Sequence, residues 1–127
     1  MSRTKRAGLK ILVVEDYEDA RLMTRLELEK RGYRVLEAVN GEEAVDIAWR
    51  ECPDVILIDL SLPVVDGLTA TKRIREDAQM SHVPVIAVTA HLEAQYRTNA
   101  LAAGCNAYVT KPVDFDWLDE LIGELLA

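Results

Sequence analysis

The feature that most constrains the fold is a regular alternation between short strand-like runs and longer amphipathic segments. Five short runs predict strands, and three of them are apolar enough to be covered on both faces. These runs are Leu9–Val14, Tyr33–Val39, Val55–Ile58, Val83–Val88 and Asn106–Val109. A segment of helical character follows each run, namely Asp19–Arg31, Glu42–Glu51, Gly67–Asp77, Leu92–Ala103 and Asp114–Leu126. Five such pairs predict an α/β protein with a doubly wound, parallel, five-stranded sheet.

Capping residues and apolar spacing support these helical segments. Asp66 stands where the third segment needs an N-cap, and Asn40 or Gly41 lies near the cap of the second. In the first segment, the apolar residues at helical spacing are Leu22, Leu26 and, as further candidates, Met23 and Leu28.

Length and charge restrict the classes of protein that the chain can represent. With 127 residues we expect one domain, with a short basic tail over residues 1–8 and the folded part over 9–127. The formal net charge of −7 repels a phosphate backbone, so we expect no direct binding to nucleic acid. No apolar run approaches the roughly 18 residues of a membrane span, and no signal peptide is evident, so we expect no membrane contact and a cytoplasmic location. Cys52 and Cys105 form no CxxC pair and are expected to be reduced core residues.

Polar side chains follow four of the five expected strands. Glu15 and Asp16 come after the first, Asp59 after the third, Thr89 after the fourth and Lys111 after the fifth. Ligands of open parallel sheets bind beyond the carboxyl ends of the strands, so we expect these side chains to converge there.

The chemistry of this set favours a phosphoryl site. Three adjacent carboxylates repel one another unless a cation joins them, and Mg²⁺ is typically held by carboxylates, waters and a phosphate. A lysine supplies a compact positive charge for a phosphoryl oxygen. Together, these groups predict a site in which one carboxylate is the nucleophile and forms an aspartyl phosphate.

Four stretches match a known family: ILVVEDYEDAR, DVILIDLSLPVVDG, PVIAVTAH and GCNAYVTKP. Thr89 follows Asp59 by 30 residues, and Lys111 follows Thr89 by 22. In these stretches and spacings, over essentially its whole length, the chain resembles the receiver domains of bacterial two-component response regulators. The resemblance implies a flavodoxin-like sheet with strand order 2-1-3-4-5 and a cis peptide bond before Pro112. It also implies a single-domain signalling protein that catalyses only its own phosphorylation and dephosphorylation.

The resemblance further implies a role for each residue of the site. Asp59 would accept a phosphoryl group from the phosphohistidine of a sensor histidine kinase or a histidine phosphotransfer protein. Asp16, Asp59 and the backbone carbonyl of Ser61 would bind Mg²⁺, with assistance from Glu15. Lys111 would pair with the phosphoryl group.

The same resemblance implies how the signal leaves the site. Thr89 would move toward the phosphoryl group, and Tyr108 would turn inward behind it. The face formed by the fourth helix, the fifth strand and the fifth helix, roughly residues 92–126, would then bind a downstream protein target or serve onward phosphotransfer. Ser61 and His91 would tune the rate of dephosphorylation.

Two other classes of protein share parts of this pattern. Flavodoxins bind FMN with a hydroxyl- and glycine-rich loop after the first strand, whereas the loop here reads VEDYED and would repel a phosphate. Phosphatases of the haloacid dehalogenase type carry a second Asp two residues after the nucleophile, where this chain has Ser61. Neither class fits as well as the receiver.

Overall fold

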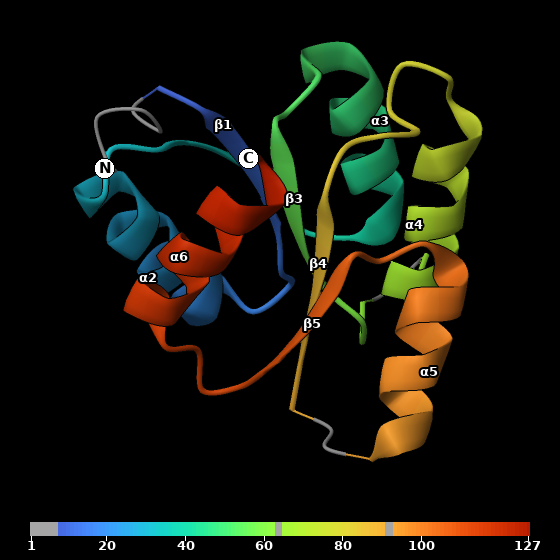
Figure 1. Cartoon of the computed structure of the whole chain (residues 1–127). Helices are drawn as coiled ribbons and strands as arrows, with labels where there is room; N and C mark the ends of the chain where they lie inside the picture. The colour runs from blue at the N-terminus through green and yellow to red at the C-terminus, as the bar shows by residue number, and fades with distance from the viewer. Residues whose placement is uncertain (1–7, 63–64, 91–92) are drawn as a thin grey trace.

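The fold is a parallel sheet between two layers of helices. The computed structural model describes residues 8–62, 65–90 and 93–127. Within them, five strands form one sheet in the order β2-β1-β3-β4-β5, with every neighbouring pair parallel (Figure 1). The strands are β1 (Lys10–Val14), β2 (Arg34–Ala38), β3 (Val55–Asp59), β4 (Val85–Thr89) and β5 (Ala107–Thr110). This order confirms the predicted fold.

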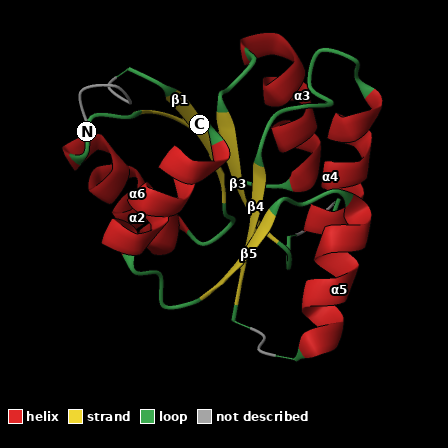
Figure 2. Ribbon diagram, in the orientation of Figure 1, coloured by secondary structure: helices red, strands yellow, loops and turns green. Residues whose placement is uncertain are grey.

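Helices cover both faces of the sheet in the described part of the chain. They are α2 (Glu18–Lys30), α3 (Gly41–Glu51), α4 (Gly67–Glu76), α5 (Ala94–Ala103) and α6 (Phe115–Leu125). Helices α2 and α6 lie on one side, and α3, α4 and α5 lie on the other (Figure 2). Successive strand residues point to opposite faces, so Leu12 and Ile56 join the core under α3 and α4, whereas Ile11 and Leu57 join the core under α6. None of the described helices combines the length and the apolar character that a membrane span requires.

The ends of the elements differ from the predicted ends by one or two residues. Strand β3 includes Asp59, and β4 begins at Val85 because Pro84 has no N–H to donate to a neighbouring strand. Asn40 is the N-cap of α3, where its side chain accepts a hydrogen bond of 2.8 Å from the N–H of Glu43. The predicted start of the fourth helix at Leu92 lies outside the described residues.

Of the predicted apolar residues of α2, Leu28 is buried and the other three are exposed. Leu22, Met23 and Leu26 are 42%, 55% and 47% exposed, and Leu28 is the buried leucine of the helix. Ala20 and Thr24, eight and four residues before Leu28, are half-buried. Because α2 turns small side chains toward the sheet, its larger apolar residues remain at the surface.

Arg75 joins three chain segments at the end of the sheet opposite the carboxyl ends of the strands. Its Nε and Nη2 donate to the carbonyl oxygen of Gly104 at 3.0 and 2.8 Å. Its Nη1 donates to the carbonyl of Val83 at 2.6 Å, and its Nη2 donates to Oδ1 of Asn106 at 2.7 Å. The guanidinium therefore ties α4 to the loops before β4 and β5.

The two cysteines have different environments. Cys105 is buried, with its Sγ 3.8 Å from the hydroxyl of Thr71. Cys52 is exposed at the end of α3, in a left-handed conformation with φ of 48°. The expectation of two core cysteines is therefore wrong for Cys52, which ends a helix where the chain turns.

Candidate functional site

Four strands deliver the predicted polar residues to one edge of the sheet. Asp59 and Thr89 are the last residues of β3 and β4, while Glu15 and Lys111 directly follow β1 and β5. The register aligns these ends, because Val14 pairs with Ile58, Asp59 with Val88 and Thr89 with Thr110. The side chains meet because parallel strands of similar length end together.

Two buried carboxylates share one lysine at the centre of this edge. Glu15 and Asp59 are each 7% exposed. The Nζ atom of Lys111 lies 3.0 Å from Oε1 of Glu15 and 3.1 Å from Oδ2 of Asp59. The other oxygen of Asp59, Oδ1, accepts a hydrogen bond of 2.8 Å from the N–H of Ser61. Asp16 stands exposed beside them, so the ammonium of Lys111 contacts two of three clustered acids.

The pKa values of Glu15 and Lys111 are both raised in this site. Burial raises the pKa of Glu15, and the charge of Asp59 adds to the rise. Hydrogen bonds from Lys111 and from the N–H of Tyr17 oppose the rise without cancelling it. Burial lowers the pKa of Lys111, but its bonds to Glu15 and Asp59 outweigh that effect and leave the pKa raised. The ammonium is therefore charged at neutral pH.

The three acids fit a hard divalent cation. One carboxylate oxygen from each of Glu15, Asp16 and Asp59 lies within 4.8 Å of the others. Oxygen donors in this number suit Mg²⁺, and the single shared ammonium leaves negative charge for the ion to balance. The acidic pocket is therefore compatible with Mg²⁺.

Two glycines shape the loop that follows Asp59. A Cβ atom on Gly67 would stand 2.4 Å from the carbonyl oxygen of Asp59, and one on Gly41 would stand 2.0 Å from the carbonyl oxygen of Val65. Neither position has room for a side chain, because the backbone of Asp59 approaches Gly67 and that of Val65 approaches Gly41. Asp66 caps α4, as predicted, by accepting a hydrogen bond of 2.8 Å from the N–H of Thr69.

Thr89, Tyr108 and the peptide bond before Pro112 were also predicted to take part in the site. Thr89 is buried at 1% exposure, and its carbonyl accepts a hydrogen bond of 2.8 Å from the N–H of Lys111. Tyr108 is half-buried on β5 and packs against the core beneath α3 and α4. The Lys111–Pro112 bond is cis, as the resemblance implied. His91 lies outside the described residues.

Two contacts to Glu15 were not predicted from the sequence. Nη1 of Arg21 donates to the carbonyl oxygen of Glu15 at 3.1 Å, while its Nε contacts Oε1 of Glu37 at 3.0 Å. The N–H of Tyr17 donates to Oε2 of Glu15 at 3.1 Å. Both contacts orient the acidic turn after β1. No sequence pattern predicts that Arg21, six positions after Glu15, contacts the carbonyl of Glu15.

The sequence matches a known family of protein domains. The family model for the response regulator receiver domain matches residues 11–123. The polar-differentiation response regulator DivK of Brucella anthropi is 38% identical over 116 residues, which make up 91% of this chain and 94% of DivK.

Solved structures agree with this match. The receiver domain of a sensor histidine kinase from Pseudomonas aeruginosa, which has a magnesium ion coordinated in its active site cleft, superposes with a TM-score of 0.89. It is 38% identical, and the match covers 94% of this chain and 98% of that chain. Chemotaxis protein CheY4 of Vibrio cholerae superposes with a TM-score of 0.88 at 28% identity, covering 94% of this chain and all (100%) of CheY4.

Proposed function

Because the chain belongs to the family of response regulator receiver domains, we propose that it is a phosphoacceptor of a two-component pathway, with Asp59 as the acceptor. The observation that carries the proposal is the position of Asp59. It is a nearly buried carboxylate that ends β3 beside two further acids and lies 3.1 Å from an ammonium. A phosphohistidine of a sensor histidine kinase or of a histidine phosphotransfer protein would be the donor.

The chain's own residues prepare Asp59 for transfer. A carboxylate oxygen of Asp59 would form a bond to phosphorus while the bond between phosphorus and the donor's imidazole nitrogen breaks. The Ser61 N–H, 2.8 Å from Oδ1, fixes the orientation of the carboxylate. Lys111, already in contact with Oδ2 at 3.1 Å, would stabilise negative charge on a phosphoryl oxygen.

Mg²⁺ is the cofactor that we assign to this site. Asp16, Asp59 and the backbone carbonyl of Ser61 would hold the ion, with Glu15 assisting. When bound, the ion would neutralise charge on the carboxylates and on the phosphoryl oxygens. The closeness of the three carboxylates, within 4.8 Å, supports this assignment.

We assign the output to the face formed by α5, β5 and α6. Thr89 would shift toward the phosphoryl group, and Tyr108 would move into the space that it leaves. Along α5 only Ala100 and Ala103 are buried, so a change in the position of this helix disrupts little apolar packing. Between α5 and α6 lies a hollow of about 550 Å³ lined by Arg97, Tyr108 and Trp117, among others. A downstream protein or the next carrier in a relay would bind there.

The remaining parts of the proposal concern the setting. A net charge of −7 disfavours direct contact with nucleic acid, and the proposed partners are proteins of the cytoplasm. Apart from its own phosphorylation and dephosphorylation, we assign no reaction to the chain. Ser61 and His91 are the positions that we expect to tune the lifetime of the phosphoryl group.

Phosphorylation with a small-molecule donor tests the proposal. Incubation with acetyl phosphate and Mg²⁺ should add one phosphoryl group by intact mass, and EDTA should prevent the addition. Asp59→Asn should abolish the adduct. Asp66→Asn is the matched control, because asparagine still caps α4 and the acid lies in the same loop. Full labelling of Asp59→Asn would place the acceptor elsewhere.

A further inference from the structure

A cavity of about 420 Å³ lies on the α2 and α6 side of the sheet and reaches the phosphoacceptor site. Its volume falls in the range of small-molecule sites in proteins. Most of its wall is apolar and comes from the central strands and from the segment around the start of α6, with Val13, Leu57, Val88, Val113, Phe115 and Leu118 as the main residues. Glu15, Asp59 and Lys111 line the part of the cavity that belongs to the site.

Two of the α2 residues that line the cavity, Ala20 and Thr24, have small side chains. Met23 also lines it but is 55% exposed, and Leu22 and Leu26, 42% and 47% exposed, do not line it. A larger residue at position 20 or 24 would fill the volume that these two leave empty.

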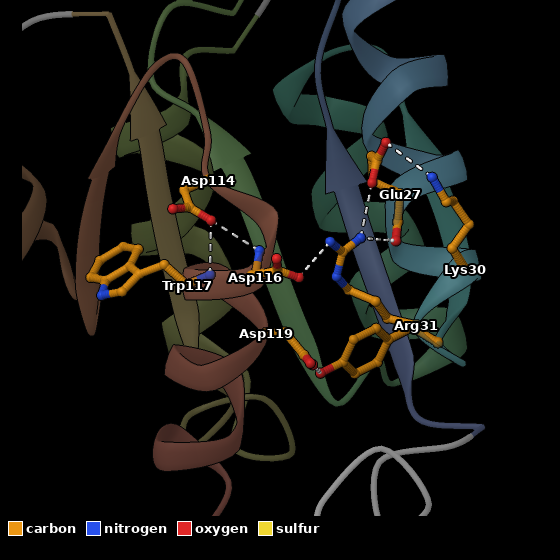
Figure 3. Close-up of polar contacts among 8 residues, drawn as sticks. Glu27, Lys30, Arg31, Asp114, Asp116, Trp117 and Asp119 are labelled. Carbon is orange, nitrogen blue, oxygen red and sulfur yellow. Dashed lines mark hydrogen bonds and ion pairs between the residues drawn. The ribbon is translucent and has the colours of Figure 1, made fainter.

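Polar contacts hold α2 and α6 in this arrangement (Figure 3). Arg31, which follows α2, contacts Oε1 of Glu27 at 2.9 Å and Oδ1 of Asp116 at 2.7 Å. The hydroxyl of Tyr33 donates to the buried carboxylate of Asp119. These contacts join the residues that follow α2 to the first turns of α6, so a change in the spacing of the two helices would disturb charge-assisted hydrogen bonds.

Negative charge is unbalanced at one place in the cavity wall. Glu27, which also lines the cavity, pairs with both Arg31 at 2.9 Å and Lys30 at 3.6 Å. Glu15 and Asp59 share Lys111 alone among the described ion pairs. An occupant should therefore combine an apolar body with a positive group directed toward Glu15 and Asp59.

We propose that this cavity binds small amphipathic cations, such as arylalkyl amines, with the ammonium at Glu15 and Asp59 and the apolar body between the sheet, α2 and α6. Binding then opposes that of a divalent ion, because both need the same carboxylates, and this second part rests on the function proposed above. By thermodynamic reciprocity, the ion lowers the affinity for the amine by the same factor by which the amine lowers the affinity for the ion.

Titration of the full chain with 4-phenylbutylamine tests the cavity. Calorimetry should give one site in metal-free buffer, and amide shifts should concentrate on residues of the cavity wall. The uncharged 4-phenyl-1-butanol should bind at least about tenfold more weakly, because it cannot make charge-assisted hydrogen bonds to the carboxylates. Equal affinity of amine and alcohol, or shifts centred elsewhere, would overturn the proposal.

Cavity-filling variants provide an independent check. Ala20→Leu and Thr24→Leu should each abolish amine binding, and at least one of them should keep the native circular dichroism spectrum. Ala102→Leu, on the exposed side of α5, is the matched control and should bind as the wild type does. Undiminished binding by a folded filled variant would contradict the assignment.

Two further readouts separate this inference from the proposed function. Saturating Mg²⁺ should weaken the amine at least about tenfold, and an affinity independent of Mg²⁺ would contradict the placement of the ammonium. Phosphorylation of Asp59 is measured in parallel without the amine. Labelling without amine binding refutes the cavity proposal alone, whereas amine binding without labelling refutes the phosphoacceptor proposal alone.

Discussion

In metal-free buffer, the Asp16→Asn variant should be more stable than the wild type. When Mg²⁺ is present, the variant should lose that advantage. One oxygen of Asp16 lies within 4.8 Å of oxygens of Glu15 and Asp59, a distance at which two unit charges repel by about 3.5 kcal/mol at an effective dielectric constant of 20. Asp16 is exposed, so water screens these repulsions, and its removal also weakens attraction to Lys111. We therefore expect a gain of about 1 kcal/mol in the free energy of unfolding in EDTA, or about 4 °C in melting temperature.

In saturating Mg²⁺, the wild type should instead be more stable than Asp16→Asn. An ion that binds only the native state adds about 2.7 kcal/mol when its concentration is a hundred times its dissociation constant. The wild type gains this amount, whereas Asp16→Asn lacks one of the proposed ligands and gains less. Mg²⁺ affinity should fall more in Asp16→Asn than in Glu15→Gln, because Glu15 is proposed only to assist.

Urea unfolding followed by circular dichroism, in EDTA and in saturating Mg²⁺, measures both effects. Glu29→Gln is the control, because it removes one exposed negative charge from α2 outside the acidic cluster. If Asp16→Asn shifts the unfolding midpoint equally in both buffers, or if Glu29→Gln behaves in the same way, the acids do not form a metal site.

Three further predictions concern other parts of the molecule. The pKa of Glu15 is raised above its ordinary value of 4.5, so the native state holds the proton of Glu15 more tightly than the unfolded state does. The stability that this proton contributes is lost as pH rises through the native pKa. Glu15→Gln should therefore gain stability relative to wild type between acidic and neutral pH in urea melts. Arg75→Met should cost about 3 kcal/mol in urea melts because the partly buried carbonyls of Met80, Val83 and Gly104 lose their donor. Arg73→Met, exposed on the same helix, should cost little, and equal costs would show that the contacts of Arg75 do not stabilise the fold. Thr89→Ala should still accept a phosphoryl group but lose the amide shifts over α5, β5 and α6 that beryllofluoride induces in wild type, and unchanged shifts would exclude Thr89 from the switch.

The parallel α/β fold class and the meeting of the site residues were predictable because both depend on local pattern and on a general rule of parallel sheets, whereas the strand order was predicted only from the resemblance to receiver domains. Short β-branched runs specify strands wherever they occur in the chain, and strands of one direction end at one edge. Asp59 and Lys111 could therefore be placed together from residues 52 positions apart. The hydrogen bond from Lys111 to Asp59 in the structure agrees with this placement.

The features that the sequence did not predict depend on contacts between distant segments. Leu22 and Leu26 of α2 indicate an apolar face, but both are exposed, and the face toward the sheet carries Leu28 with the half-buried Ala20 and Thr24. Arg75 donates a hydrogen bond to Gly104, which lies 29 positions later in the chain, and no local sequence pattern predicts that partner. Gly41 looks like a helix start, whereas its lack of a side chain is needed because the loop at Val65 passes 2.0 Å from where a Cβ would be.

Chemical trapping of the phosphorylated residue is the most direct test of the central claim that Asp59 is the acceptor. Borohydride reduces an acyl phosphate to an alcohol, so an aspartyl phosphate becomes homoserine at the residue that carried the phosphoryl group. Protein labelled by a phosphohistidine donor, reduced and digested with trypsin, should yield the peptide spanning residues 51–72 with homoserine at position 59 by fragmentation mass spectrometry. Homoserine at position 54 or 66 of the same peptide, or at position 16 elsewhere, with aspartate intact at position 59, would contradict the account.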